Sequence, residues 1–181
     1  MDYEYLICST AFKIKPYYII SATKDNYLHL TGVNTKLKAS EFFSKCITKT
    51  LTESDFDFIK KNQTEKEVKG YVRKKMHVLS QITDILKSDV FTEEQFKKGR
   101  IFCSFATSTK NFTFGFVTPW AKSRPKTLLK GNHLKFPEKV DLILRKKPKS
   151  HLFSKIILGS TDDTKEYYPY IKEIISNSLI K

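Results

Sequence analysis

Residues 99–131, GRIFCSFATSTKNFTFGFVTPWAKSRPKTLLKG, contain the segments that decide the fold. Two runs rich in aromatic and β-branched residues, 101–106 and 112–117, are typical of β-strands. The polar residues between them, 107–111, have the composition of a turn, so the sequence predicts an antiparallel hairpin. A basic segment follows the hairpin directly and contains Lys122, Arg124, Lys126 and Lys130. This stretch therefore predicts a cationic loop beside a sheet, where an RNA phosphodiester could be bound.

The positive charge of the chain is concentrated around the same stretch. The whole sequence has 33 Lys and Arg residues against 19 Asp and Glu residues, a net charge of +14. Residues 97–155 hold 15 of the basic residues and only Glu138 and Asp141 of the acidic ones, so this third of the chain carries a net charge of +13. A composition that favours lysine everywhere would spread the charge evenly, whereas segregated charge indicates a polyanionic partner.

The length and composition are those of one folded domain. A chain of 181 residues with 40% hydrophobic and 13% aromatic residues can bury a single core and is not disordered. No apolar run approaches the roughly 18–20 residues that span a bilayer, and the acidic start, Met1 to Tyr5, is unlike a secretory signal. The cysteines lie far apart in apolar segments, which predicts reduced thiols in a cytoplasmic protein: Cys8, Cys46 and Cys103. Their spacing supports neither a disulfide nor a metal site, so no metal and no cofactor are expected.

Hydrophobic periodicity predicts helices in the first half of the chain. Residues 38–48 and 64–87 have apolar side chains at three- and four-residue spacing. Thr64 and Glu67 resemble a capping box, which marks the start of the longer helix. Residues 91–99 are expected to form a short helix or turn that leads into the hairpin.

The second half of the chain predicts a sheet followed by a helix. Runs 140–145 and 153–159 are predicted as its third and fourth strands, and residues 165–181 as an amphipathic terminal helix. Runs 5–12 and 17–21 are too short for periodicity to distinguish a helix turn from a strand. The predicted fold class is therefore α+β, with N-terminal helices packed on a four-stranded antiparallel sheet and a C-terminal helix. The single domain, residues 1–181, is expected to comprise a helical part at 1–98, a sheet part at 99–160 and the terminal helix.

Two polar features of the predicted helical part are candidates for function. His29 lies between two leucines, where a histidine is often a packing residue. Imidazole is nevertheless the side chain whose ordinary pKa suits proton transfer near neutral pH. Helix 64–87 carries basic residues at four-residue spacing: Lys69, Arg73 and His77. This row is either a solvated face or a ridge that faces RNA, if the helix packs across the sheet.

Three segments resemble a known nuclease family. They are the H-L-x-G element His29-Leu30-Thr31-Gly32, residues 123–131 (SRPKTLLKG), and the late pair VDLILRKK and FSKIILGS. In this order and spacing they resemble the phage-borne members of the barnase–EndoU–colicin–RelE nuclease superfamily, abbreviated PBECR, over most of residues 20–160.

The resemblance implies N-terminal helices on a four-stranded antiparallel sheet and metal-independent cleavage of RNA by a toxin or by a phage or mobile-element effector. His29 matches the histidine of the H-L-x-G element, and Lys126 and Thr127 match a basic-Pro-Lys-Ser/Thr segment of the family. Catalytic residues vary between the branches of this superfamily, so the resemblance transfers no fixed catalytic set.

Cleavage of RNA without a metal needs a base for the 2′-hydroxyl proton, an acid for the departing 5′-oxygen and cations for the charged phosphorane. We expect His29 to act as the base or the acid. The predicted catalytic residues are His29, Lys126 and Arg145. The predicted RNA-binding residues are Lys69, Arg73, Lys122, Ser123, Arg124, Thr127, Lys130 and Ser160. Candidates of lower rank are Trp120, Tyr71 and Phe116 for base stacking, each of which also suits a buried core, and His77, His133 and His151.

Two other classes of function fit the same sequence. A non-catalytic nucleic-acid-binding protein that kept the fold would bind with a steep salt dependence and leave RNA uncut. An interaction module would use the basic face to bind an acidic partner, such as an antitoxin or inhibitor protein. The expected partners are therefore RNA or an acidic protein, and a membrane is not expected.

Overall fold

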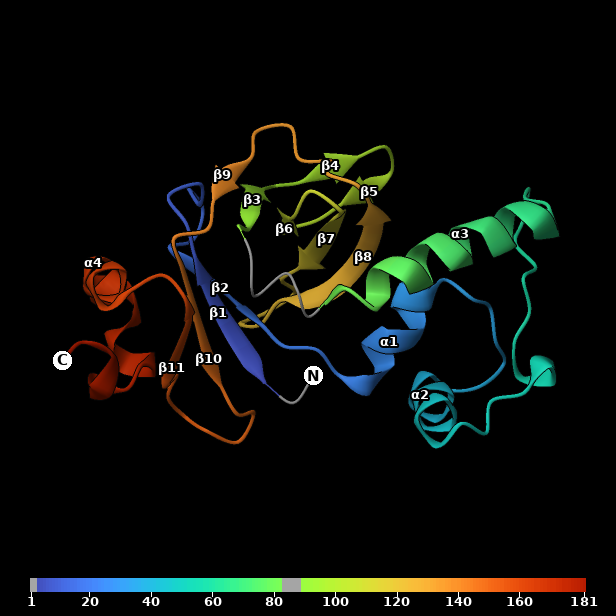
Figure 1. The fold of residues 1–181 in the computed structure, drawn as a ribbon, viewed down its shortest axis with the longest axis horizontal. Coiled ribbons are helices and arrows are strands. Elements are labelled where there is room, and N and C mark those ends of the chain that lie inside the picture. The colour runs from blue at the N-terminus through green and yellow to red at the C-terminus, as the bar shows by residue number, and fades with distance from the viewer. Residues whose placement is uncertain (1–2, 83–88) are drawn as a thin grey trace.

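The computed structural model describes residues 3–82 and 89–181. Two antiparallel sheets form the centre of the molecule, and helices lie on opposite flanks (Figure 1). The α+β class is confirmed. The predicted single four-stranded sheet is wrong, because the strands divide between two larger sheets and a small hairpin.

The first sheet has the strand order β11-β10-β1-β2. Its strands are β1 (Glu4–Cys8), β2 (Tyr17–Ile20), β10 (Leu142–Lys146) and β11 (Lys155–Leu158). All five residues of β1 are buried, and β10 lies beside β1 in antiparallel register. The two late strands predicted from the sequence therefore exist, but β10 pairs with the N-terminal strand β1 and β11 pairs with β10, in a different sheet from the hairpin.

The second sheet has the order β8-β7-β6-β3-β9. Its strands are β3 (Phe91–Glu94), β6 (Phe105–Ser108), β7 (Phe112–Val117), β8 (Arg124–Lys130) and β9 (Glu138–Lys139). The predicted hairpin is confirmed, since β6 and β7 pair in antiparallel register. The basic segment after the hairpin is strand β8 and not a loop.

The segment between the helices and the hairpin also differs from its prediction. Residues 91–99 were expected to form a short helix or turn, but they contain β3 and the short strand β4 (Lys97–Lys98). β4 pairs with β5 (Ile101–Phe102) as a separate two-stranded hairpin. β3 pairs with β6 on one side and with β9 on the other. This pairing outweighs the weak local preference of the short polar segment for a helix or turn.

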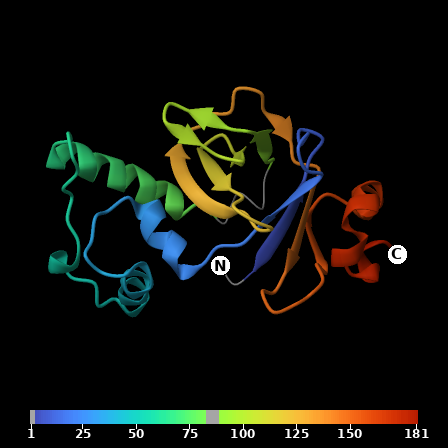
Figure 2. The ribbon, with the colours of Figure 1, turned by 180° about the vertical axis from the view of Figure 1, so that it is seen from behind.

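Of the α-helices in the described part of the chain, three lie on the β8 side of the molecule and one lies over the first sheet (Figures 1 and 2). They are α1 (Lys24–Thr31), α2 (Ala39–Thr48), α3 (Glu65–Leu79) and α4 (Thr161–Ile171), with a 3₁₀ turn at Glu53–Asp55. The Thr64 and Glu67 capping box is confirmed at the start of α3. The predicted continuation of this helix to residue 87 falls partly on residues 83–88, outside the described part of the chain.

The terminal helix is shorter than predicted. α4 begins at Thr161, where Ser160 and Asp163 form a capping box, and Pro169 lies inside it and not near its start. Two 3₁₀ turns follow, Lys172–Ile174 and Asn177–Leu179.

Two apolar clusters occupy opposite faces of the first sheet. Side chains of β1, β2 and β10 pack toward β6, β7 and β8 in the larger cluster, which includes Ile143. The other face packs against α4 and the C-terminal turns and includes Leu142 and Leu144. Leu142 and Leu144 therefore face one side of β10 and Ile143 faces the other, which places β10 in the centre of the molecule.

A backbone bridge joins the two sheets beside the start of α1. Ser123, just before β8, forms a parallel bridge with Ile20 at the end of β2. The Ser123 amide donates to the Ile19 carbonyl at 2.7 Å, and the Ser21 amide donates to the Ser123 carbonyl at 3.0 Å. α1 begins three residues after Ser21, so this junction fixes the start of α1 beside the start of β8.

Candidate nucleic-acid interface

The H-L-x-G element forms the last turn of α1. Leu30 is 5% exposed and belongs to the central core together with Leu128 of β8 and Val78 of α3. Gly32 ends the helix in the left-handed conformation, with φ +76°. His29 lies on the exposed side of the same turn. The helix is therefore anchored to β8 through Leu30, while the imidazole remains open to solvent.

Two lysines from other elements surround the end of α1. The Lys60 ammonium donates to the Gly32 carbonyl at 2.8 Å. Lys75 of α3 runs beside Gly32, and a Cβ placed on that glycine would lie 2.9 Å from Lys75 Cδ. Burial, and then the nearby charge of Lys60, lower the pKa of Lys75. The end of α1 thus combines an exposed imidazole with two ammonium groups.

Strand β8 presents the basic residues that follow the hairpin. Arg124 and Lys130 are exposed at its two ends. Lys126 occupies a bulge, because Gly115 and Phe116 of β7 pair with Thr127 and Pro125 and leave Lys126 without a partner on that strand. The Lys126 ammonium donates to the Phe102 carbonyl at 2.7 Å.

Helices α1 and α3 both pack against β8. The exposed histidine and the basic strand therefore belong to neighbouring elements, as Figure 1 shows for α1, α3 and β8. Thr127 is buried on β8, and its methyl group lies against Gly115 of β7. In this arrangement its side chain packs within the sheet, and its proposed contact with RNA stays a prediction.

Lys122 and Ser123 lie at the junction of the two sheets. Ser123 is fully buried, and its hydroxyl is 2.8 Å from that of Thr118. The Lys122 ammonium is 2.5 Å from Oε1 of Glu4, and the Lys146 ammonium is 3.6 Å from Oε2 of the same carboxylate. Glu4 is 4% exposed, so its charge is enclosed between the two lysines.

Arg145 and Ser160 are not brought to β8. Arg145 is on β10 in the first sheet, with its guanidinium carbon 4.0 Å from the centroid of the Tyr3 ring. Ser160 is the N-cap of α4, where its hydroxyl is 2.6 Å from Oδ2 of Asp163. Their predicted roles in catalysis and RNA binding remain predictions, on elements separate from His29 and Lys126.

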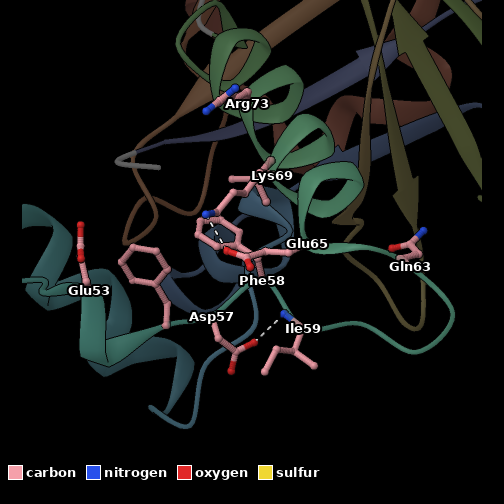
Figure 3. A pocket seen from close by; sticks show the side chains of 10 residues that line it. Glu53, Asp57, Phe58, Ile59, Gln63, Glu65, Lys69 and Arg73 are labelled. Atoms are coloured by element: carbon pink, nitrogen blue, oxygen red, sulfur yellow. Dashed lines mark hydrogen bonds and ion pairs between the residues drawn. The ribbon is translucent and has the colours of Figure 1, made fainter.

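Lys69 and Arg73 line a pocket of about 710 Å³ between α3 and the segment that precedes it (Figure 3). The Lys69 ammonium lies 5.2 Å from the centroid of Phe58 and 2.6 Å from Oε1 of Glu65. Asp57 also lines the pocket, and the pKa of its carboxyl is lowered by hydrogen bonds from the Ile59 amide and the Asn34 side chain. The pocket therefore joins aromatic, cationic and anionic side chains.

The candidates of lower rank have varied surroundings. Trp120 and Tyr71 are 83% and 54% exposed, whereas Phe116 is buried and stacks on Phe105. Phe116 is thus a core residue. His133 contacts the Lys98 ammonium at 2.5 Å, and the His77 ring lies 3.3 Å from the Gln81 side chain.

The sequence prediction omitted Lys60 and Lys75. A signal for Lys75 was nevertheless present, because it occupies an apolar position of α3. Val68, Val72 and Leu79 repeat at four- and three-residue spacing, and Lys75 falls on the same stripe. A charged residue in a buried stripe indicates a partner or a function. No comparable signal marks Lys60, which reaches Gly32 from a turn 28 residues away.

The fold and the surface define a basic α+β protein in which helices pack on the last strand of an antiparallel meander. The chain belongs to the phage-barnase-EndoU-colicin E5/D-RelE-like nuclease 4 family, whose model matches residues 1–162. The match includes α1, α3, β8 and β10, and confirms the resemblance found in the sequence. No curated protein and no solved structure matches the chain significantly.

The described residues contain neither a membrane-spanning helix nor a cluster of metal-ligating side chains. None of the helices within residues 3–82 and 89–181 is long and apolar enough to cross a membrane. In the same part of the chain, no three His, Cys, Asp or Glu side chains are grouped so that they could hold a metal ion.

Proposed function

We propose that this protein is an endoribonuclease that cleaves RNA through its own 2′-hydroxyl group and needs no metal ion. One observation carries the proposal beyond family membership: α1, which bears His29 on its exposed side, packs against the strand that bears Arg124, Lys126 and Lys130. A proton-transfer group and a row of cations thus occupy adjacent elements, which is what cleavage of a charged phosphodiester requires.

The proposed reaction is an internal transfer of the phosphoryl group. The 2′-oxygen bonds to the adjacent phosphorus as a base removes its proton, and the bond from phosphorus to the 5′-oxygen breaks as an acid protonates that oxygen. The products are a 2′,3′-cyclic phosphate and a free 5′-hydroxyl. The phosphorane formed on the way has a greater negative charge on its oxygens than the substrate, so nearby cations accelerate the step.

The residues divide between these roles by chemistry and position. His29 is the base or the acid, because its imidazole is exposed on the helix that contacts β8. Lys126 supplies positive charge from β8, where its hydrogen bond to the Phe102 carbonyl fixes the ammonium. Arg124 and Lys130 hold neighbouring phosphates at the exposed ends of the strand, and Arg124 can bond two oxygens at once.

The pocket beside α3 supports binding of a longer strand. Lys69 and Arg73 lie one helical turn apart on α3, on the α1 side of the molecule and away from the first sheet (Figures 1 and 3). The Phe58 ring in the same pocket offers a stacking surface for a base. RNA that continues beyond the scissile linkage would contact this pocket.

The proposal is tested with the purified chain, total RNA and an excess of EDTA. Fragments that end in cyclic phosphate and begin with a free 5′-hydroxyl are the expected result. Intact RNA that shifts in a gel, with a log–log salt slope near −0.7 for each phosphate contacted on a single strand, would instead show a binding protein without activity. Fragments that appear only after a divalent metal is restored would contradict the metal-free mechanism.

A further inference from the structure

The end of α1 holds two positive charges that lack a counterion. Lys60 and Lys75 both reach Gly32, from a turn and from α3 respectively. Within residues 3–82 and 89–181, no carboxylate oxygen lies within 4.0 Å of either ammonium. The Gly32 carbonyl and the negative end of the α1 dipole compensate these charges only in part. An anion bound here would complete the balance.

Gly32 leaves the space that Lys75 occupies. A Cβ on Gly32 would lie 2.9 Å from Lys75 Cδ and 3.3 Å from its Nζ, and φ +76° also disfavours any larger residue. The lysine therefore runs directly over the last turn of α1, and its ammonium ends beside the helix and not out in solvent.

The spacing of the H-L-x-G element places Lys75 near His29. His29 belongs to the last turn of α1, and Gly32 caps that turn. The lysine that lies against Gly32 is therefore at the end of the turn that carries the imidazole. Each defined position of the element then has a physical role: His29 faces solvent, Leu30 anchors the helix in the core, and Gly32 admits Lys75.

Electrostatics favours a phosphate at this point. Lys75 is partly withdrawn from water and close to Lys60, and both effects lower its pKa. A phosphodiester that approached both ammonium groups would relieve their repulsion and restore the solvation that Lys75 has lost. Its position beside His29 would be suited to proton transfer.

We propose that Lys75, assisted by Lys60, contacts the non-bridging oxygens of the scissile phosphate next to His29 and stabilises the phosphorane. This proposal rests on the ribonuclease function above and adds a catalytic residue to it. It also assigns a role to the one charged residue on the buried stripe formed by Val68, Val72 and Leu79 of α3.

The first test compares two adjacent lysines of α3. Lys75→Met keeps a side chain of similar length over Gly32, and Lys74→Met removes one charge from the exposed face, where Lys74 lies 6.0 Å from the Tyr71 ring centroid. Single-turnover cleavage of a defined oligoribonucleotide should slow by about 10²–10³-fold in Lys75→Met, the effect of removing one group that stabilises an oxyanion. Lys74→Met should stay near the wild-type rate, and Lys75→Arg should regain part of the loss. Equal rates in the two methionine variants would overturn the proposal.

A second test does not depend on catalysis. Inorganic phosphate is titrated at constant ionic strength, and the melting temperatures of wild type, Lys74→Met and Lys75→Met are compared. Phosphate also stabilises proteins by exclusion from their surface, so the difference between the variants gives the result. Wild type and Lys74→Met should be stabilised more than Lys75→Met. This outcome would support the anion site even if the wild type failed to cleave RNA, whereas identical shifts in all three proteins would remove it.

Discussion

Two pairs of lysines in this molecule have opposite surroundings. Lys122 and Lys146 lie on either side of the buried carboxylate of Glu4, where the two sheets meet. Lys60 and Lys75 both lie against Gly32, where α1 ends, and the Lys60 ammonium donates to the Gly32 carbonyl. Among the described residues, the first pair is matched by a carboxylate, whereas the second meets a backbone carbonyl and no carboxylate.

The difference separates structural charge from charge that is available for a ligand. Removing a lysine from water is costly unless an anion replaces the lost solvation. Glu4 provides that anion permanently and also accepts a hydrogen bond from the Ser21 hydroxyl at 3.2 Å. At the end of α1 the backbone offsets this cost only in part for the half-buried Lys75, which is typical of a site that is completed by its substrate. We therefore propose that the catalytic centre lies at α1 and β8 and that the Glu4 cluster contributes to stability.

The largest effect is expected from His29. His29→Gln should slow RNA cleavage by roughly 10²–10⁴-fold, the contribution of one general acid or base. Since the imidazole is exposed, the melting temperature should stay unchanged. Lys126→Ala should also abolish cleavage with the fold intact. The rate is measured in single-turnover assays in EDTA, with circular dichroism as the check on folding.

A matched control for His29 is available on the other sheet. His151→Gln alters an exposed imidazole in the connection between β10 and β11 and should cleave RNA as the wild type does. Full activity in both His29→Gln and Lys126→Ala would show that neither α1 nor β8 holds the catalytic centre.

Glu4 provides the next largest effect and tests the other half of the comparison. Glu4→Gln leaves Lys146, whose side chain is 13% exposed, without its counterion. The free energy of unfolding should fall by roughly 3 kcal/mol, the lower end of the range for breaking a buried ion pair, because Lys122 is 47% exposed and can regain water. Urea denaturation measures this loss. RNA cleavage by the folded fraction should be unaffected, and a loss of cleavage without a loss of stability would move the catalytic centre to the junction of the sheets.

Local pattern predicted the elements better than their pairing. The hairpin of β6 and β7, the helix α2 and the capping box of α3 follow from nearby residues, and the structure confirms them. The division into two sheets does not follow, because β1 and β10 pair across 130 residues or more. Periodicity does not decide whether run 5–12 is a helix turn or a strand. Part of this run is strand β1, and because β10 pairs with β1, the sheet that contains β10 stays undecided as well.

The sequence predicts individual residues of the candidate site, but it does not predict which of them the fold brings together. The H-L-x-G element and the basic residues of β8 are visible in the sequence, and both lie within the residues that the family model matches. The contact of Lys75 with Gly32 joins residues 43 positions apart, and only packing of α1 on α3 creates it. Arg145 was grouped with Lys126 by its charge, and the structure places it on the other sheet, against Tyr3, so its catalytic role stays a prediction.

The smallest effect is expected from an ion pair inside the helical unit, which comprises α1, α2 and α3 (residues 24–79). This ion pair sharpens the contrast with Lys75. Lys45 of α2 bonds Asp55 at 2.8 Å, and this contact, followed by the Thr52 amide, lowers the pKa of Asp55 to about 2. The helical unit therefore does pair a lysine with a carboxylate where a structural bond is needed. Within the described residues, the absence of a carboxylate beside Lys60 and Lys75 is then a property of that site.

The pH dependence of stability tests this pair. A carboxyl with a pKa near 2 in the folded protein and about 3.9 unfolded stabilises the fold fully above roughly pH 4 and loses that contribution as the pH falls toward 2. Urea denaturation between pH 5 and pH 2 should therefore show a shallower decline for Asp55→Asn than for wild type. Glu173→Gln, which alters an exposed carboxylate on the C-terminal 3₁₀ turn, serves as the control and should follow the wild type. If the stability of Asp55→Asn and Glu173→Gln declined alike as the pH fell, the contact between Lys45 and Asp55 would not stabilise the fold. A lysine without a carboxylate partner elsewhere in the helical unit would then no longer distinguish a ligand site from an ordinary surface.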